Sequence, residues 1–255
     1  MRAILSVAFL NLKQGIKEKL FWGVVFFLAF FLFLSLLLGN LSPGETENVL
    51  RNAGISGIEI SGIILVVFSF VFSYYREIDS RILEIYLSKF SRSNYISGKL
   101  LGYSLICLFY LILSGLGYIL ILCFQGAFLW PVLPGIYVLF LKLSLVLCWC
   151  AVFCCLFSSP ILALLCVFSF YFASEAAYPA LKIISLGQGQ GGFKLSLFQT
   201  IYYLLPNMNK LNIKPAVTYG NLPSLAFFIF ISLYSFIYIL FLWLIARFIF
   251  LRKEY

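Results

Sequence analysis

The chain has 255 residues, of which 63% are hydrophobic and 11% are charged, and its mean hydropathy is +1.06. Soluble domains are about half apolar and about a quarter charged, so the composition predicts an all-α polytopic membrane protein without a separate soluble domain. The chain contains no histidine, which excludes histidine-based acid–base catalysis, histidine metal ligands and Ser-His triads.

Residues 1–19 predict an amphipathic helix that lies in the membrane interface and leads into the first span. Five apolar residues recur in it at helical spacing: Ile4, Leu5, Ala8, Leu12 and Ile16. A signal peptide is the alternative, but the apolar core is short and no small-residue cleavage site follows it.

Six apolar runs of about 18 to 25 residues predict membrane-spanning helices. They cover residues 20–38, 58–75, 100–124, 136–157, 161–178 and 225–245. Ser158–Pro160 predicts a tight turn between the fourth and fifth spans, since proline suits the first turn of a helix.

Positive residues predict the orientation of the spans. If the N-terminus is cytoplasmic, the cytoplasmic segments carry twelve lysines and arginines, and the external segments carry five. Because positive residues favour the cytoplasmic side, we predict that both termini are cytoplasmic. The net charge of +9 then reflects topology, so the expected partner is the lipid bilayer and not nucleic acid.

The segment 179–224 is predicted to form an external loop. Pro179 is expected to end the fifth helix. Residues 193–206 form an apolar run of about twelve residues, too short to span a bilayer and therefore predicted to be interfacial or re-entrant. If this run did span, the C-terminus would lie on the opposite side. The loop also offers a surface for a periplasmic partner.

Between the second and third spans, residues 73–103 gather eight charged residues. The spacing predicts a helix over 77–89 with an apolar stripe that includes Ile78, Ile82 and Ile85. The serines and asparagine of 91–94 predict a turn and a helix N-cap, and a second helix then leads from Asn94 into the third span. The expected element is a cytoplasmic helix-turn-helix over 76–99; the alternative is an amphipathic loop that only lies on lipid.

The stretch REIDSRILEIYLSKFSRSNYISGKLLG, residues 76–102, resembles the hallmark motif of ABC-2 type transporter permeases. That motif reads approximately E-x-D/E-x-G-x-L-E-x-L-L-S-x-P-x-S-R, followed by G-K. Ten residues match it: Glu77, Asp79, Leu83, Glu84, Leu87, Ser88, Ser91, Arg92, Gly98 and Lys99. The basic first helix, six spans and the external LLPN (Leu204–Asn207) fit the same layout. Two positions depart from it, Arg81 in place of glycine and Phe90 in place of proline, with one residue missing.

The resemblance implies that the whole chain, residues 1–255, is one ABC-2 type transmembrane domain in a bacterial or archaeal plasma membrane. It implies pairing with a second permease copy, as a homodimer or heterodimer, and docking on a cytoplasmic ABC ATPase subunit. The implied ATPase-coupling residues are Glu77, Ile78, Asp79, Arg81, Ile82, Glu84, Ile85, Tyr86, Lys89 and Arg92. The chain has no Walker-type loop, so ATP and Mg would be bound by the partner ATPase, and this chain would hold no cofactor.

Three charged residues fall within the predicted spans: Glu59, Lys142 and Glu175. Intramembrane charges are costly and usually face the bundle interior or water. We predict a Lys142–Glu175 pair with Glu59 nearby, in a polar layer that lines the outer mouth of a transport pathway. The alternatives are a structural salt bridge or side chains that reach to the interface.

All seven cysteines fall within predicted spans, so no disulfide is expected. Cys150 and Cys154 share a helix face, which is compatible with a soft metal such as Cu(I). No methionine or histidine joins them, so we expect them to pack as small apolar residues, with no metal site.

The resemblance therefore implies the permease subunit of an ATP-driven transporter, and we expect it to export or translocate an amphiphilic, lipid-like or envelope-related substrate. The first alternative is an ABC-coupled machine that assembles or extracts envelope proteins and moves no solute. The second is an integral membrane enzyme, but the absence of histidine, the single aspartate and the lack of a Gly-x-Ser-x-Gly motif argue against it.

Overall fold

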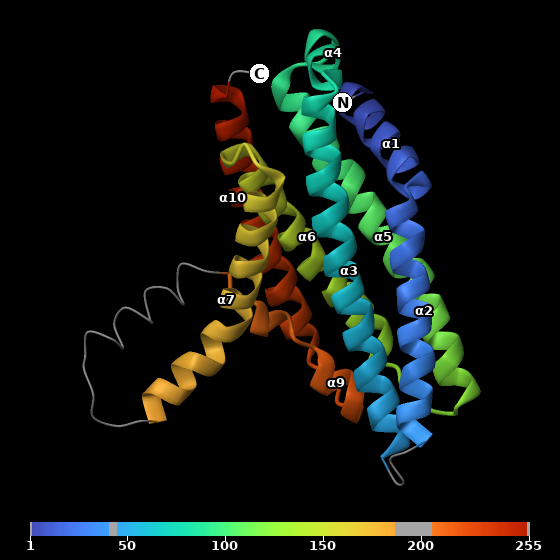
Figure 1. The fold of residues 1–255 in the computed structure, drawn as a ribbon. Helices are drawn as coiled ribbons and strands as arrows, with labels where there is room; N and C mark the ends of the chain where they lie inside the picture. Colours follow the sequence, from blue (N-terminus) through green and yellow to red (C-terminus); the bar gives the residue numbers. More distant parts are fainter. Residues whose placement is uncertain (1, 41–44, 187–205, 254–255) are drawn as a thin grey trace.

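The computed structural model describes residues 2–40, 45–186 and 206–253, and every regular element in these ranges is a helix (Figure 1). In chain order the elements are α1 (Arg2–Lys17), α2 (Lys19–Asn40), α3 (Thr46–Asp79), α4 (Ile82–Lys89), α5 (Arg92–Phe124), α6 (Val132–Leu156), α7 (Pro160–Leu186), η1 (Met208–Leu211), α9 (Lys214–Tyr219) and α10 (Leu225–Arg252).

Six of these helices are long and apolar enough to cross a membrane, which is the number that the sequence predicted. They are α2, α3, α5, α6, α7 and α10. Several extend beyond the predicted apolar runs: α3 begins twelve residues before residue 58, and α10 continues through the basic tail to Arg252. Apolar composition marks only the lipid-facing part of a helix, whereas backbone hydrogen bonds continue beyond it.

The start of α1, the end of α10 and the short helix α4 lie together at one end of the bundle (Figure 1). We call this end the α4 end and the opposite end the far end. The arrangement agrees with a chain whose termini lie on the same side as the charged hairpin. That this side is the cytoplasm stays a prediction.

Helix α6 forms the centre of the bundle. It contacts α3, α5, α7 and α10. In its most apolar stretch of 18 residues, 89% of the residues are buried, compared with 17% in the corresponding stretches of α7 and α10. A helix that is apolar all round must be buried or face lipid. α6 therefore fills the core, whereas α7 and α10 present most of their apolar surface outward.

Helix α1 packs lengthwise along the first half of α5 through small residues. A methyl group added at Gly98 would lie 2.8 Å from Val7 Cβ, and one added at Gly102 would lie 2.8 Å from the Ala8 carbonyl oxygen. Glycines four residues apart allow helix backbones to approach closely in membranes. The prediction of an N-terminal helix is confirmed, and that it lies in the membrane interface stays a prediction.

Pro179 does not end the fifth helix as predicted. It lies inside α7, which continues to Leu186. The predicted interfacial or re-entrant run 193–206 lies outside the described residues except for its last residue. Between α7 and α10, the described residues form η1 and α9, and α9 packs along the first half of α3.

Candidate functional site

The tip of the charged hairpin is the short helix α4, held between the ends of α3 and α5. The prediction of one continuous helix over 77–89 is wrong, because α3 ends at Asp79 and α4 begins only at Ile82. The break occurs at Arg81, which has a left-handed φ of 55° and is the single non-glycine residue with positive φ in the described part of the chain. Arg81 occupies the position at which the resembled motif has glycine, the residue that adopts this conformation without strain.

The predicted turn after α4 is confirmed, although the second helix begins at Arg92, two residues earlier than expected. Ser91 forms its N-cap, and the Ser91 hydroxyl accepts a hydrogen bond from the Asn94 N–H at 3.4 Å. The second helix of the hairpin is therefore the first part of α5 itself, continuous with the membrane span.

Helix α4 is anchored by one side chain and exposes most others. Leu83 is 2% exposed, whereas Ile82 and Ile85 are 41% and 59% exposed. Six of the predicted coupling residues are exposed: Asp79, Arg81, Ile82, Glu84, Ile85 and Lys89. Apolar side chains rimmed by charges of both signs form a surface that a protein partner can cover.

Three other predicted coupling residues, Ile78, Tyr86 and Arg92, are partly buried. The Tyr86 ring lies 5.8 Å from the Tyr95 ring, and burial, with a smaller effect of the Glu77 carboxylate, raises the pKa of Tyr86. The Arg92 guanidinium donates to the Lys253 carbonyl at 2.7 Å, so it holds the end of α10 against the start of α5.

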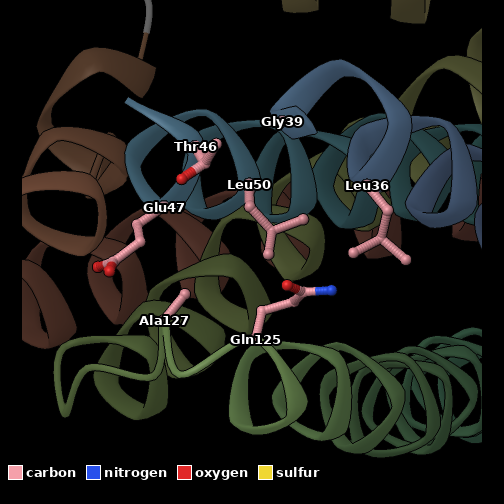
Figure 2. Close-up of a pocket in the computed structure, with 7 residues that line it drawn as sticks. All are labelled: Leu36, Gly39, Thr46, Glu47, Leu50, Gln125 and Ala127. Carbon is pink, nitrogen blue, oxygen red and sulfur yellow. The ribbon is translucent and has the colours of Figure 1, made fainter. Parts of the chain in front are cut away.

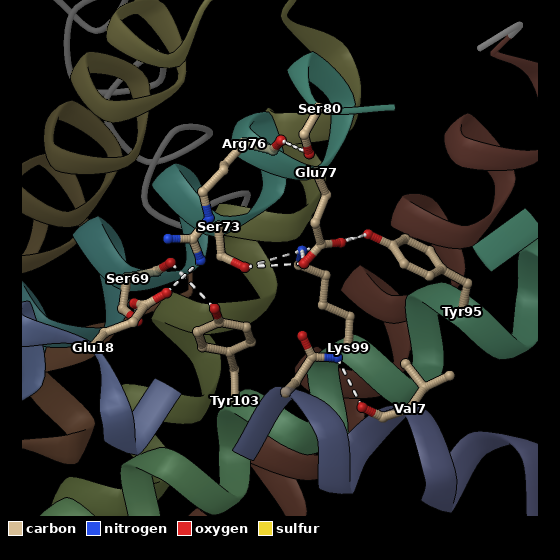
Figure 3. Close-up of polar contacts among 11 residues, drawn as sticks. Val7, Glu18, Ser69, Ser73, Arg76, Glu77, Ser80, Tyr95, Lys99 and Tyr103 are labelled. Carbon is tan, nitrogen blue, oxygen red and sulfur yellow. Dashed lines mark hydrogen bonds and ion pairs between the residues drawn. The ribbon is translucent and has the colours of Figure 1, made fainter. Parts of the chain in front are cut away.

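Glu77 is buried, unlike the six exposed residues of the same predicted set, and its role in coupling stays a prediction. Its side chain is 5% exposed and lies 2.7 Å from the Nζ of Lys99, which is fully buried. Ser73 and Tyr95 both donate hydrogen bonds to the Glu77 carboxylate (Figure 3). We call Ser73, Glu77, Tyr95 and Lys99 the α4-end cluster. Each carboxylate oxygen has a partner, as a buried charge requires.

Further polar contacts join the helices beside this cluster. Glu18, in the link between α1 and α2, pairs with Arg76 of α3 at 2.5 Å, as Figure 3 shows. Lys253 donates to the carbonyl groups of Cys155 and Phe157 at the end of α6, both at 3.2 Å. Side-chain contacts at the α4 end therefore link α3, α5 and the ends of α6 and α10, and tie the α1–α2 link to α3, in addition to apolar packing.

A second buried cluster lies nearer the far end. Lys142 Nζ of α6 is 2.6 Å from Glu59 of α3 and 2.8 Å from Glu175 of α7, so the predicted Lys142–Glu175 pair forms and Glu59 joins it. Two further side chains bind Glu59: Lys214 of α9 at 2.8 Å and the Tyr171 hydroxyl at 3.1 Å. We call these five residues the far-end cluster. That they line a transport pathway stays a prediction.

The far-end cluster contains two lysines and two glutamates, so its formal charges cancel. Lys142 and Glu59 are 1% and 4% exposed, whereas Glu175 and Lys214 are 31% and 30% exposed. A buried charge without a partner costs several kcal/mol, and pairing offsets this cost. A balanced cluster gives no net attraction for an ionic cargo; it joins α3, α6 and α7 to one another and links α9 to α3.

Pro179 and Asn209 explain how α7 continues through a proline. Proline has no backbone N–H, so the carbonyl of Glu175, four residues earlier, has no helical partner. The side-chain amide of Asn209 in η1 donates to this carbonyl at 2.6 Å. The segment between α7 and α10 therefore completes the hydrogen bonding of α7 beside the far-end cluster.

The two clusters are separated by a nearly constant distance because both are anchored on α3. Glu59 and Glu77 are eighteen residues apart, which is about 27 Å along a helix. The large apolar side chains of α3 that are exposed are Ile60 and Phe72, and both lie between Glu59 and Glu77 in the sequence. The exposed apolar side chains of α3 therefore lie between the two clusters.

Beyond the far-end cluster, Arg51 joins α3 to the α5–α6 connection and to α9. It is 7% exposed, and it donates to the carbonyl groups of Ala127 at 2.7 Å and Thr218 at 3.3 Å. A cavity of about 30 Å³ lies beside it, between α2, α3 and the α5–α6 connection, and Leu50 and Gln125 point toward each other across it (Figure 2). This cavity has room for about one water molecule, so it is too small for a transported substrate.

Five cysteines are buried in the bundle: Cys107, Cys148, Cys150, Cys154 and Cys155. In the described ranges, no three His, Cys, Asp or Glu side chains form a group that could hold a metal ion. The buried cysteines pack as small apolar residues against neighbouring helices.

Sequence reasoning identified Glu59, Lys142 and Glu175 because charges are rare within apolar runs. It missed Lys214, Tyr171 and Asn209, whose partners lie far away in sequence. It also assigned Lys99 only a role in topology and in the motif. Comparison of the chain with protein-family models gives no match, and comparison with curated proteins gives no match either.

Proposed function

We propose that this chain is the permease subunit of an ATP-driven ABC transporter, and that α4 docks on a separate ATPase subunit that hydrolyses ATP. The observation that carries this proposal is the surface of α4. Ile82 and Ile85 are exposed beyond the bundle and are surrounded by Arg81, Glu84 and Lys89. A membrane-protein helix that exposes apolar side chains outside the spans is suited to a protein partner.

The connections of α4 suit a mechanical role. It is joined to α3 by a two-residue turn and to α5 by two residues, and Leu83 anchors it to the bundle. A partner that moves α4 would therefore move the ends of two long helices. The match of the sequence to the ABC-2 hallmark motif supports the same role, as does the left-handed conformation of Arg81 at the motif's glycine position.

The proposed cargo is amphiphilic, lipid-like or related to the cell envelope, and the proposed direction is export. The spans expose mainly phenylalanine, leucine and isoleucine, which suits such a cargo better than a small ion. We further propose that two permease subunits pair in a bacterial or archaeal plasma membrane, and that segment 179–224 faces outward, where a periplasmic partner could bind.

Co-purification tests the docking surface. The chain is expressed with the ABC ATPase encoded beside it and extracted in mild detergent, and the ATPase recovered with it is measured. Ile85→Asp should reduce the recovered ATPase at least tenfold, because it places a charge in the proposed contact. Leu222→Asp is the matched control, since Leu222 is 54% exposed in the loop between α9 and α10, which is not part of the proposed surface.

If Ile85→Asp and Leu222→Asp both retain the ATPase, α4 is not the docking site. If the folded wild-type chain elutes alone in the presence of each candidate ATPase, the permease proposal fails. If the complex does form, transport of labelled lipid into vesicles distinguishes an exporter from a machine that works on envelope proteins, since only the exporter moves the lipid.

A further inference from the structure

An apolar groove of about 450 Å³ lies between α1, α5, α6 and α10 in the half of the bundle nearer the α4 end. Its walls include Ser97, Leu101 and Ser104 of α5, Phe140 and Ser144 of α6, and Trp243 of α10. These helices are spanning helices, except α1, so the groove opens sideways toward the space that membrane lipid occupies.

The polar groups of the groove are already used within the protein. The hydroxyl groups of Ser97, Ser104 and Ser144 each donate to a carbonyl of their own helix at 2.8 Å. The Trp243 indole N–H donates to the Ser97 hydroxyl at 3.0 Å. A water molecule in this groove would find no free hydrogen-bond donor on its walls, so the walls favour a hydrocarbon occupant.

One end of the groove carries a cation. The Arg247 guanidinium carbon lies 5.4 Å from the centre of the Trp243 ring, and Trp243 itself lines the groove. Arg247 is partly exposed, and no salt bridge joins it to a carboxylate of the described residues. A guanidinium that is stacked on an aromatic ring and retains free donors is well suited to bind a phosphate.

We propose that this groove binds one acyl chain of a phospholipid from the leaflet at the α4 end, and that Arg247 binds the phosphate of that lipid. From Arg247 to Ile239, which lines the deeper part of the groove, α10 rises by about 12 Å. This is close to the depth of one leaflet, about half of the ~30 Å hydrocarbon core. The proposal requires only that the chain spans a membrane, so it is independent of the ATPase.

The test uses the full chain in nanodiscs that contain a phosphatidylglycerol with a photoactivatable acyl chain. After irradiation, labelled peptides are mapped by mass spectrometry. The label should concentrate on the groove segments of α5, α6 and α10. Arg247→Gln should reduce this labelling at least fivefold, because the phosphate loses its partner.

Arg252→Gln is the matched control. Arg252 stacks on Phe248 of the same helix at 4.1 Å, and Phe248 is not part of the groove wall. This variant removes the same charge and should leave the labelling unchanged.

A second pair of variants tests the groove itself. Ser104→Phe fills the groove and should abolish the labelling. Leu105→Phe adds the same ring at a neighbouring exposed position outside the groove wall, and should not change the labelling.

Three results would overturn the proposal. The first is equal groove labelling in Arg247→Gln and wild type. The second is equal labelling by a photoactivatable diacylglycerol, which has the same chains and no phosphate. The third is a Ser104→Cys chain that crosslinks efficiently to a second copy through this groove, because a protein would then be the occupant.

Discussion

Lys99 of α5 and Glu77 of α3 form an ion pair at 2.7 Å in which neither side chain is more than 5% exposed. The lysine also lies over the rings of Tyr74 and Tyr95, at 5.5 and 5.7 Å from their centres. Both charges belong to the motif that first suggested a coupling role, yet they face each other inside the bundle. Their position ties the two helices that hold α4.

Removing one charge of this pair should lower the stability of the protein far more than removing both charges. Lys99→Met leaves Glu77 charged and buried, and should lower the free energy of unfolding by about 3–5 kcal/mol. Adding Glu77→Gln should restore most of the loss. Denaturation in detergent followed by circular dichroism measures both variants, and additive effects would show that the pair is not coupled.

Arg81→Gly should stabilise the hairpin. Arg81 holds a left-handed φ of 55°, which costs a residue with a side chain about 1 kcal/mol and costs glycine little. We expect a higher melting temperature for the chain purified without the ATPase. Ser80→Gly is the control, since Ser80 has a φ of −85° and should gain nothing. A lower melting temperature for Arg81→Gly would mean that its guanidinium makes an essential contact.

In the far-end cluster, the effect of each substitution should follow burial. Lys142→Met leaves Glu59 and Glu175 with Lys214 as the one remaining cation of the cluster, and should cost about 3–5 kcal/mol because Glu59 is buried. Glu175→Gln removes a charge that is 31% exposed and should cost about 1 kcal/mol or less. Chemical denaturation of both variants measures the difference. Equal losses would show that burial does not set the energetics of this cluster.

Pro179 and Asn209 should act as a pair. Asn209→Ala leaves the Glu175 carbonyl without a partner and should cost about 1–3 kcal/mol. In a Pro179→Ala background, the restored backbone N–H can bind that carbonyl, so the same Asn209→Ala change should cost much less. A double-mutant cycle on unfolding gives the coupling energy. A coupling energy of zero would contradict the contact.

The glycine seam between α1 and α5 makes a paired prediction. Gly102→Ala places a methyl group 2.8 Å from the backbone of α1, whereas Gly117, on the same helix, has open space around its Cα. Gly102→Ala should therefore separate the helices and lower stability, and Gly117→Ala should be neutral or stabilising by up to about 1 kcal/mol. Thermal unfolding and the rate of protease cleavage within α1 report the two effects.

The six spans could be predicted because apolar runs of this length have few other uses in proteins. The turn at Ser91 followed from local capping chemistry, and Glu59, Lys142 and Glu175 were visible as charges in an apolar background. These signals are local, so one segment of sequence is enough to show them.

The remaining contacts could not be predicted from the sequence because they join distant segments. Lys214 is 155 residues from Glu59 and looks like any loop lysine. Pro179 has the usual features of a helix end, and only the position of Asn209 allows α7 to continue. Glu77 and Ile85 both looked suitable for a partner, and only the fold buries one and exposes the other.

The spacing of the two charge clusters along α3 has a consequence for the choice of membrane. A single span can slide or let its end side chains reach for the surface when the bilayer is too thick. Here the pairs join different helices and hold the two clusters about 27 Å apart along α3, so the protein cannot adjust by moving either cluster along a single helix. In thicker lipid it can only tilt or thin its surroundings, at a cost for each ångström of hydrophobic mismatch.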